Sequence, residues 1–267
     1  MERKKLTISD IQRLKRNGRR IASVTAYDYA FAKIVDAAGV DIILVGDSLG
    51  MVMLGYRDTT RVSLEAMLHH TRAVAQAEPK ALLVGDMPFL SYGVSRAETI
   101  RNAGRFLQEA GAQAVKLEGG LRVQDEIKAL VDREVPVMGH IGLTPQSIHR
   151  FGGYKVQGKD PEAADALFRD ALAVQEAGAF SVVLECVPAP LARRVTEELR
   201  VPTIGIGAGP GCDGQVLVLH DILGLYGEIS PKFAKVYAPL GSLAGEAIAA
   251  FVREVREGQF PGPEHSF

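Results

Sequence analysis

The sequence alternates, from residue 21 onward, between short apolar runs and longer segments with the periodicity of amphipathic helices. The apolar runs are nearly continuous in Val, Ile and Leu, which is typical of parallel strands that are buried on both faces. The helical segments begin at capping residues such as Ser95 and Asp160, and they end near glycines such as Gly111 and Gly178. Eight runs are predicted to be strands, at residues 21–26, 42–46, 81–86, 114–118, 135–140, 181–186, 201–205 and 233–238.

Eight strands that alternate with helices predict an α/β protein of the (β/α)8 type, a TIM barrel. An open, doubly wound sheet is the alternative that the same pattern allows. The 267-residue chain shows no linker, composition break or low-complexity stretch, so we expect a single domain over residues 1–267. Residues 1–20 are expected to form an N-terminal helical extension, in which Ser9 and Gln12 form a capping box and Gly18 ends the helix.

Charged residues are balanced, with 31 Lys and Arg against 32 Asp and Glu and a formal net charge of −1. No overall field therefore draws the protein to nucleic acid or to an anionic membrane. No apolar run approaches the ~20 residues that a membrane-spanning helix needs. The two cysteines, Cys186 and Cys212, form neither a metal motif nor a disulfide framework. We expect a cytoplasmic protein that binds neither nucleic acid nor membrane.

Acidic residues end four of the predicted strands: Asp47, Asp86, Glu118 and Glu185. Three of them close a weak internal repeat that runs glycine, strand, acid, at residues 39–47, 111–118 and 178–185. Each acid alone could be only the N-cap of the next helix. In a barrel, however, the carboxyl ends of the strands converge on one mouth, where active sites lie. Four carboxylates gathered there repel one another unless a cation compensates them.

The first three of these acids are an all-oxygen donor set. Asp47, Asp86 and Glu118 suit a hard cation, and Mg²⁺ is the natural choice because it keeps waters and accepts substrate oxygens. Zinc would prefer His and Cys, and the sequence lacks the spacing of such a site. The adjacent pair His69 and His70 has the wrong spacing for a shared ligand face, so we interpret it as structural.

Lys116 lies in one of the predicted strands that end in an acidic residue. Lys116 precedes Glu118 by two residues, so both side chains leave the strand on one face. If that face is the barrel interior, the lysine must meet anions, either a carboxylate or a developing enolate. The alternative is a lysine on the outer face under a helix. His140 ends the next predicted strand and could simply be a hydrogen-bonding residue. Glu185, on the sixth strand, is a candidate general base whose pKa is raised by burial.

Two glycine-rich segments resemble nucleotide-binding motifs only in part. Residues 153–159 nearly match a phosphate-binding loop, but Asp160 replaces the required Ser or Thr and no strand precedes them. Residues 205–209 follow a strand but lack the acid about 20 residues later that a dinucleotide site needs. We therefore predict no nucleotide site, although a phosphorylated ligand after the seventh strand stays an alternative. Residues 151–159 are expected to form a loop over the mouth.

The chain resembles the ketopantoate hydroxymethyltransferase family over nearly its whole length. An ordered set of short motifs carries the resemblance and is far more specific than any one of them. The matching motifs are Thr25-Ala26-Tyr27-Asp28, Val45-Gly46-Asp47-Ser48-Leu49-Gly50, Gly85-Asp86-Met87-Pro88-Phe89, Val115-Lys116-Leu117-Glu118-Gly119-Gly120, Gly139-His140-Ile141-Gly142-Leu143-Thr144-Pro145-Gln146, Gly152-Gly153-Tyr154-Lys155-Val156-Gln157-Gly158, Leu184-Glu185 and Ile204-Gly205-Ile206-Gly207-Ala208-Gly209.

The resemblance implies a (β/α)8 fold, a homodecamer and a Mg²⁺-dependent one-carbon transfer. A hydroxymethyl group passes from 5,10-methylenetetrahydrofolate to 3-methyl-2-oxobutanoate through a Mg²⁺-stabilised enolate. The product is 2-dehydropantoate, at the first step of pantothenate biosynthesis towards coenzyme A. Carried over by motif, the metal residues are Asp47, Asp86 and Glu118, the substrate-binding residues are Asp47, Ser48, Asp86, Lys116 and His140, and the proton acceptor is Glu185.

Two other functions fit the same residues less well. A metal-dependent 2-oxo acid lyase or aldolase of the phosphoenolpyruvate/isocitrate lyase type would share the acids and the enolate but need no folate. Such an enzyme would usually carry a reactive cysteine at the mouth, and Cys186 is the candidate. A barrel that has lost its chemistry and serves as a binding module should also have lost members of the acid, lysine and glutamate set, which this chain retains.

Overall fold

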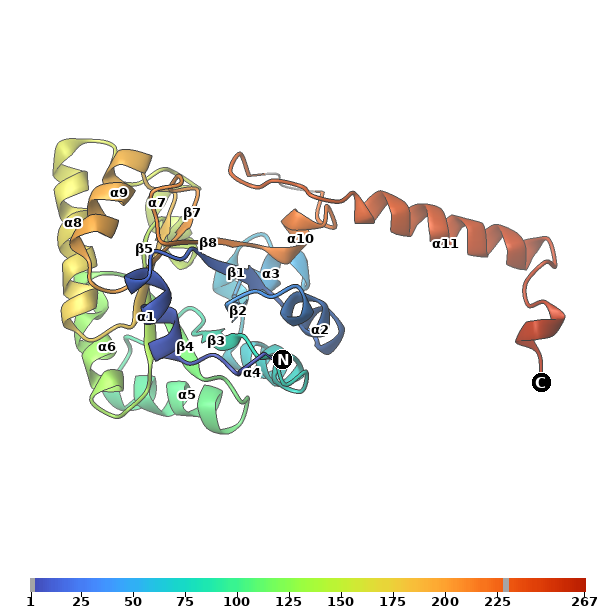
Figure 1. Ribbon diagram of the computed structural model, residues 1–267, viewed down its shortest axis with the longest axis horizontal. Helices are drawn as coiled ribbons and strands as arrows, with labels where there is room; N and C mark the ends of the chain where they lie inside the picture. The colour runs from blue at the N-terminus through green and yellow to red at the C-terminus, as the bar shows by residue number, and fades with distance from the viewer. Residues whose placement is uncertain (1–2, 228–230) are drawn as a thin grey trace. The chain divides into compact units, whose positions relative to one another are not determined.

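The computed structural model describes residues 3–227 and 231–267 (Figure 1). The chain divides into two compact units, Met1–Val218 and Leu219–Phe267. We call the first the barrel unit and the second the C-terminal unit. Within the described residues, all strands and all candidate site residues belong to the barrel unit.

The strands of the barrel unit form one closed parallel barrel in the order β1 to β8, with β8 paired to β1. This confirms the (β/α)8 fold and excludes the open sheet. The first seven strands lie within two residues of their predicted ends. The strands are β1 (Ile21–Thr25), β2 (Ile42–Val45), β3 (Leu82–Asp86), β4 (Ala114–Glu118), β5 (Val137–Gly142), β6 (Ser181–Glu185), β7 (Thr203–Ile206) and β8 (Gly214–Leu217).

The prediction of the eighth strand at residues 233–238 is wrong. That segment is irregular and belongs to the C-terminal unit, and Tyr237 within it is exposed. The strand that closes the barrel begins at Gly214, after a short loop that contains no helix. A Cβ at Gly214 would lie 2.5 Å from the carbonyl oxygen of Ile21 and 2.8 Å from Ile204. Only glycine at residue 214 therefore lets β8 pack between β7 and β1. The helix that we expect between the seventh and eighth strands is not present between β7 and β8.

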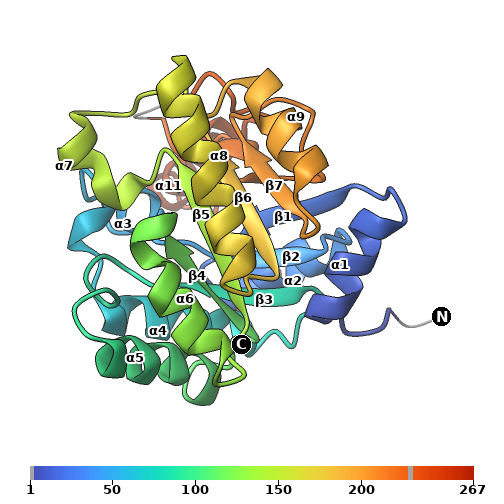
Figure 2. The ribbon, with the colours of Figure 1, turned by 90° about the vertical axis from the view of Figure 1, so that its left-hand side faces the viewer.

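Helices cover the outer side of the strands, as Figure 2 shows for α6, α8 and α9 beside β5, β6 and β7. Two predicted caps are confirmed: Ser95 accepts the Glu98 N–H, and Asp160 accepts the Ala163 N–H. The helices of the barrel unit are α1 (Ile8–Arg16), α2 (Tyr29–Ala37), α3 (Leu49–Val52), α4 (Leu64–Ala75), α5 (Arg96–Gln108), α6 (Gln124–Val131), α7 (Ile148–Phe151), α8 (Pro161–Glu176) and α9 (Ala189–Glu198), with 3-10 turns at Thr59–Arg61, Leu121–Val123 and Pro145–Ser147.

Helix α1 lies at the amino-terminal end of the barrel. Its N-cap is Thr7 and not Ser9 as predicted, because the Thr7 hydroxyl and the Asp10 carboxylate bond to each other's backbone N–H. Ile11 is fully buried in the cluster of side chains that fills the barrel. Lys15 donates to the carbonyl of Thr196 and pairs with Asp213, which ties α1 to the barrel wall. Because α1 covers the amino-terminal end of the barrel, a functional site is expected at the carboxyl end of the strands.

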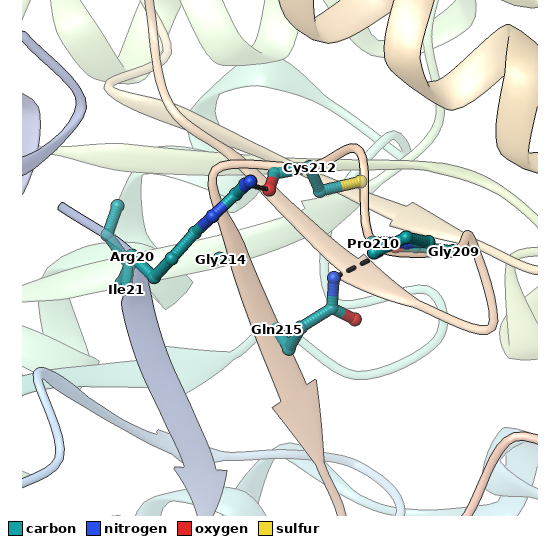
Figure 3. A pocket seen from close by; sticks show the side chains of 7 residues that line it. All are labelled: Arg20, Ile21, Gly209, Pro210, Cys212, Gly214 and Gln215. Carbon is teal, nitrogen blue, oxygen red and sulfur yellow. Dashed lines mark hydrogen bonds between the residues drawn. The ribbon is translucent and has the colours of Figure 1, made fainter. Parts of the chain in front are cut away.

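A surface cavity of about 470 Å³ lies where the loop between β7 and β8 approaches the start of β1 (Figure 3). Arg20 donates across it to the carbonyl of Cys212, and the Gln215 amide donates to the carbonyl of Gly209. None of the predicted site residues lines it. The lining residues are Arg20, Ile21, Gly209, Pro210, Cys212, Gly214 and Gln215.

The C-terminal unit contains α10 (Leu219–Ile222), α11 (Leu240–Arg256) and a 3-10 turn at Pro263–His265. None of the residues of α11 is buried. Several large apolar side chains of this helix are exposed, namely Leu243, Ile248, Phe251, Val252 and Val255. Across residues 3–227 and 231–267, no helix combines the length and apolarity that crossing a bilayer requires.

Candidate active site

The acids predicted at strand ends lie together at the carboxyl end of the barrel. Asp86, Glu118 and Glu185 are the last residues of β3, β4 and β6, and His140 lies within β5. Asp47 follows β2 by two residues. Because all the strands run in one direction, their last residues meet at one rim. The side chains are buried, and even that of Glu185 is only 14% exposed.

Lys116 points into the barrel and contacts these acids. Its Nζ lies 2.9 Å from Asp86 Oδ1 and 3.9 Å from Glu118 Oε1. It also lies 2.9 Å from His140 Nδ1. Burial lowers the pKa of Lys116, but the charges of Asp86, Glu118 and Asp47 outweigh burial and raise this pKa above its ordinary value. The lysine is therefore an ammonium ion in the middle of the cluster.

The three acids nearest Lys116 have raised pKa values. Burial raises the pKa of Asp47 to about 6, and the charge of Glu118 adds to this. Burial likewise raises the pKa of Asp86 to about 7, against the opposing charge of Lys116. The pKa of Glu118 rises to about 8, again through burial, which outweighs Lys116. Each acid thus holds its proton more tightly than in water, as expected where negative charges gather out of solvent.

His140 connects Lys116 to Glu185. Burial lowers the pKa of His140 to about 4, and the charge of Lys116 lowers it further. The ring is therefore neutral at pH 7. Because the ammonium of Lys116 can only donate, Nδ1 accepts its hydrogen and Nε2 carries the ring proton. Nε2 lies 3.2 Å from Glu185 Oε2. Burial raises the pKa of Glu185, while the contact with His140 opposes this rise.

Ser48 lies beside the acids, one residue after Asp47 and at the start of α3. Its Oγ is 2.8 Å from the Tyr27 hydroxyl, which comes from the segment after β1. The histidine pair on α4 is separate from this group. There, His70 Nδ1 lies 2.7 Å from the carbonyl of Tyr27, a contact that suits the structural role predicted for it.

Two residues that contact the acidic residues were not predicted from the sequence, Gln146 and Tyr92. Gln146 donates to Asp47 and to Glu118, and the Tyr92 hydroxyl donates to Gln146. Gln146 belongs to a motif that supports the family resemblance, but its spacing suggests no role. Both side chains are uncharged, so no charge pattern identifies them.

The oxygen atoms of the acids are suitable ligands for a hard cation, but their side chains are not already arranged around one metal position. Within the described ranges, no three His, Cys, Asp or Glu side chains already converge on one point as ligands. Glu118 Oε1 is nevertheless buried and receives no hydrogen bond. Together with the oxygens of Asp47 and Asp86 it forms the donor set that Mg²⁺ prefers. Since these three side chains do not yet converge, binding Mg²⁺ would require at least one of the carboxylates to turn toward the other two.

Cys186 follows Glu185 directly, in a strained conformation. Its φ of 48° is rare for a residue with a side chain. Its N–H donates to Ile206, and its carbonyl accepts the N–H of Gln157, so neighbouring segments hold this conformation. Burial, together with the charge of Glu185, raises the pKa of Cys186 to about 12. The thiol is therefore protonated at neutral pH and does not resemble a reactive cysteine.

The loop at residues 151–159 lies beside the site. Besides the bond from Gln157 to Cys186, the Tyr154 hydroxyl donates to the Met51 sulfur at 3.4 Å. The loop therefore contacts the segment after β6 and helix α3 after β2.

Comparison with known proteins identifies the family. The model of the ketopantoate hydroxymethyltransferase family matches residues 5–263. The chain belongs to this family. The 3-methyl-2-oxobutanoate hydroxymethyltransferase of Pelobacter propionicus is 60% identical, over 99% of this chain and 98% of its own length. That of Geobacter sulfurreducens is 59% identical over 98% of both chains. As a member of the ketopantoate hydroxymethyltransferase family, the chain is an enzyme of the transferase type.

Solved structures of other enzymes share the fold of this ketopantoate hydroxymethyltransferase family member. A phosphonopyruvate hydrolase in complex with oxalate and Mg²⁺ has a TM-score of 0.62 at 15% identity, covering 97% of this chain and 93% of that one. A 2,3-dimethylmalate lyase of the PEP mutase/isocitrate lyase superfamily has a TM-score of 0.60 at 17% identity, covering 96% and 92%. At such low identity the likeness supports the barrel fold alone.

Proposed function

We propose that this enzyme transfers a hydroxymethyl group from 5,10-methylenetetrahydrofolate to 3-methyl-2-oxobutanoate and forms 2-dehydropantoate, in the first step of pantothenate biosynthesis. Its family membership supports the overall reaction. The observation that carries the chemistry is the contact series Lys116–His140–Glu185 beside three buried carboxylates. This contact series supports a reaction that needs a fixed positive charge and a general base close together.

Glu185 is proposed as the proton acceptor. The proton to be removed lies on the carbon next to the ketone and is only weakly acidic in water. Since burial raises the pKa of Glu185, this carboxylate is a stronger base than an exposed one. General base catalysis of this kind typically contributes about 10²–10⁴-fold to the rate. The electron pair of the broken C–H bond then forms the enolate of the keto acid.

Lys116, Ser48 and His140 are proposed to bind the keto acid. The ammonium of Lys116 offers a positive charge to its carboxylate or to the enolate oxygen, in a site from which water is excluded. The enolate carbon forms a bond to the methylene carbon as one of the two methylene–nitrogen bonds of the folate breaks. Water then replaces the second nitrogen, so the new hydroxyl group takes its oxygen from water and tetrahydrofolate leaves with the proton taken from the keto acid and one proton from water. The loop at residues 151–159 is proposed to cover the site during these steps.

Asp47, Asp86 and Glu118 are proposed to hold Mg²⁺. Bound there, Mg²⁺ would act as a Lewis acid toward the oxygens of the keto acid, an effect worth several kcal/mol. Before binding, Lys116 supplies the positive charge that these carboxylates need.

The enzyme is further proposed to be a cytoplasmic homo-oligomer, a decamer by its resemblance to the family. The exposed apolar side chains on α11 support an association of copies. A mass near ten times 28.7 kDa in light scattering would agree with a decamer, whereas a single-chain mass would contradict any oligomer.

Proton NMR in deuterated water tests the reaction. With Mg²⁺ and 3-methyl-2-oxobutanoate, the signal of the proton next to the ketone should disappear, and hydroxymethyl signals should follow once methylenetetrahydrofolate is added. EDTA or Glu185→Gln should stop the exchange. Exchange without product would favour the lyase or aldolase function, and no exchange with any divalent metal would contradict the enzyme chemistry.

A further inference from the structure

We infer that Gln146 is a positioning residue that orients Asp47 and Glu118 for a divalent cation. This inference rests on the proposed function, since it concerns the metal site used there. It assigns a role to an uncharged side chain that is proposed neither to bind the substrate nor to transfer a proton in the reaction.

Gln146 bonds to both carboxylates at once. Its side-chain Nε2 donates to Asp47 Oδ2 at 2.9 Å, and its backbone N–H donates to Glu118 Oε2 at 3.0 Å. Each acid thus has one oxygen bound by Gln146. The second oxygen of Glu118, Oε1, is buried and receives no hydrogen bond. Gln146 therefore determines which oxygen of Glu118 remains available as a ligand.

The amide of Gln146 can be oriented in only one way. Its Nε2 also donates to the carbonyl of Met87 at 3.0 Å, and that carbonyl can only accept. Its Oε1 accepts from the Tyr92 hydroxyl at 2.7 Å. The same hydroxyl accepts the backbone N–H of Glu118 at 3.1 Å. All polar atoms of the amide are used, so the side chain is fixed while buried.

The neutrality of Gln146 matters as much as its position. A Lys or Arg here would form an ion pair with Asp47 and Glu118 and would compete with a cation for their oxygens. The amide of Gln146 satisfies one oxygen of Asp47 and adds no positive charge to the site. Partners of this kind fix the direction of metal ligands, and their loss typically weakens metal binding about 10–100-fold.

Gln146→Met tests the side-chain part of this role, because methionine has a similar length but no side-chain donor for Asp47, while its backbone N–H still donates to Glu118. The probe is Mn²⁺, whose free concentration is read by electron paramagnetic resonance in titrations of the metal-free protein. We expect Gln146→Met to weaken Mn²⁺ binding at least 10-fold. Saturating Mn²⁺ should restore most of kcat, so the main kinetic effect is a higher KM for the metal.

Two further variants separate positioning from folding. Tyr92→Phe removes the hydroxyl that fixes the amide but keeps Gln146, so it should weaken Mn²⁺ binding less than Gln146→Met does. Gln108→Met, on the exposed face of α5, is the matched control and should change nothing. The unfolding midpoint of each variant is measured in EDTA. A lower midpoint with unchanged Mn²⁺ affinity in Gln146→Met would overturn the inference and leave only a structural role.

The same titration distinguishes this inference from the proposed function. If the unaltered enzyme binds Mn²⁺ and exchanges the keto acid proton while Gln146→Met binds Mn²⁺ equally well, only the inference fails. If the unaltered enzyme binds no Mn²⁺, the proposed metal site fails and the inference fails with it.

Discussion

Glu185 and Cys186 are consecutive residues, yet the barrel gives them opposite properties. The Glu185 side chain faces His140 inside the site, whereas the strained backbone of Cys186 bonds to the neighbouring β7 strand and to the 151–159 loop. A residue in the left-handed region costs on the order of 1 kcal/mol, and such strain often gathers at functional sites. Here it ends β6 directly after the proposed base.

The first prediction concerns the thiol of Cys186. With its pKa raised to about 12 by burial, only about one thiol in ten thousand is ionised at pH 8. We expect iodoacetamide to label Cys186 far more slowly in the folded than in the unfolded protein, as measured by mass spectrometry. Cys186→Ser should keep most of the activity. Rapid labelling together with loss of activity would instead support the lyase function.

The second prediction concerns His140 and the pH dependence of proton exchange. Because the base form of Glu185 is required, exchange should rise with pH through the raised pKa of Glu185. The contact with His140 lowers this pKa, so His140→Gln should move the acidic limb of the pH profile to higher pH. Exchange rates by NMR from pH 5 to pH 9 measure the shift. An unmoved limb in His140→Gln would show that the contact does not affect the base.

At the scale of single residues, the sequence predicts the charged side chains that the structure brings together in the candidate site, but it does not predict Gln146 or Tyr92. A lysine or an acid inside an apolar strand is conspicuous, because burying a charge is costly unless it meets a partner. Gln146 carries no charge, and it lies 99 residues from Asp47 along the chain. Only the closed barrel brings these two residues together, so no local pattern could reveal the contact.

Among the elements, the loop at residues 151–159 is the one expected to respond to substrate. It contacts the site region through Tyr154, which bonds to Met51, and through Gln157, which bonds to Cys186. We predict that Mg²⁺ and the keto acid together slow proteolytic cleavage within this loop, because a bound ligand favours the closed arrangement. Equal cleavage rates with and without ligands, followed by mass spectrometry, would count against a covering role.

The strand β8 depends on a glycine at its first position. A Cβ at residue 214 would lie 2.5 Å from the carbonyl oxygen of Ile21, and neither backbone can move without disturbing the pairing of β1 with β8. We predict that Gly214→Ala lowers the free energy of unfolding by about 1–3 kcal/mol, as overpacking does. Urea unfolding measures the change.

Gly104→Ala is the matched control for that substitution. Gly104 lies within α5, and a Cβ there would meet no atom within 4 Å. It should therefore leave stability unchanged or raise it by up to about 1 kcal/mol, because alanine favours helix. Equal effects of the two substitutions would contradict the close packing at residue 214.

The missed eighth strand has a physical explanation. Seven strands could be predicted because each is an apolar run that follows a helix. Strand β8 begins with glycine, has the polar Gln215 at its second position and follows β7 without a helix. A search for the next apolar run after a helix therefore passes over it and selects residues 233–238, which form no strand.

For the molecule as a whole, the acids make stability depend on pH. The pKa values of Asp47, Asp86 and Glu118 are raised to about 6, 7 and 8 in the folded state, chiefly by burial. Between pH 4 and pH 8 the folded protein thus holds protons that the unfolded chain has lost. Without metal, we predict that the free energy of unfolding falls as pH rises through this window. Urea unfolding in EDTA at several pH values measures it.

A divalent cation should reverse that trend, since it replaces the protons on the same carboxylates. The stabilisation by Mg²⁺ or Mn²⁺ is therefore expected to be small at pH 5 and larger at pH 8. Asp86→Asn, which removes one of the acids, should flatten the pH dependence in EDTA. Stability that rises with pH in the absence of metal would contradict the assignment of raised pKa values.

The single ammonium of Lys116 has a consequence for the order in which the reactants assemble. One positive charge lies among the four carboxyl groups of Asp47, Asp86, Glu118 and Glu185, so these side chains together carry a net negative charge whenever more than one carboxyl group is ionised. The keto acid is itself an anion and would enter against this charge. Binding should therefore be sequential, with the cation first and the keto acid second. Without the cation, the affinity of the enzyme for the keto acid should be low.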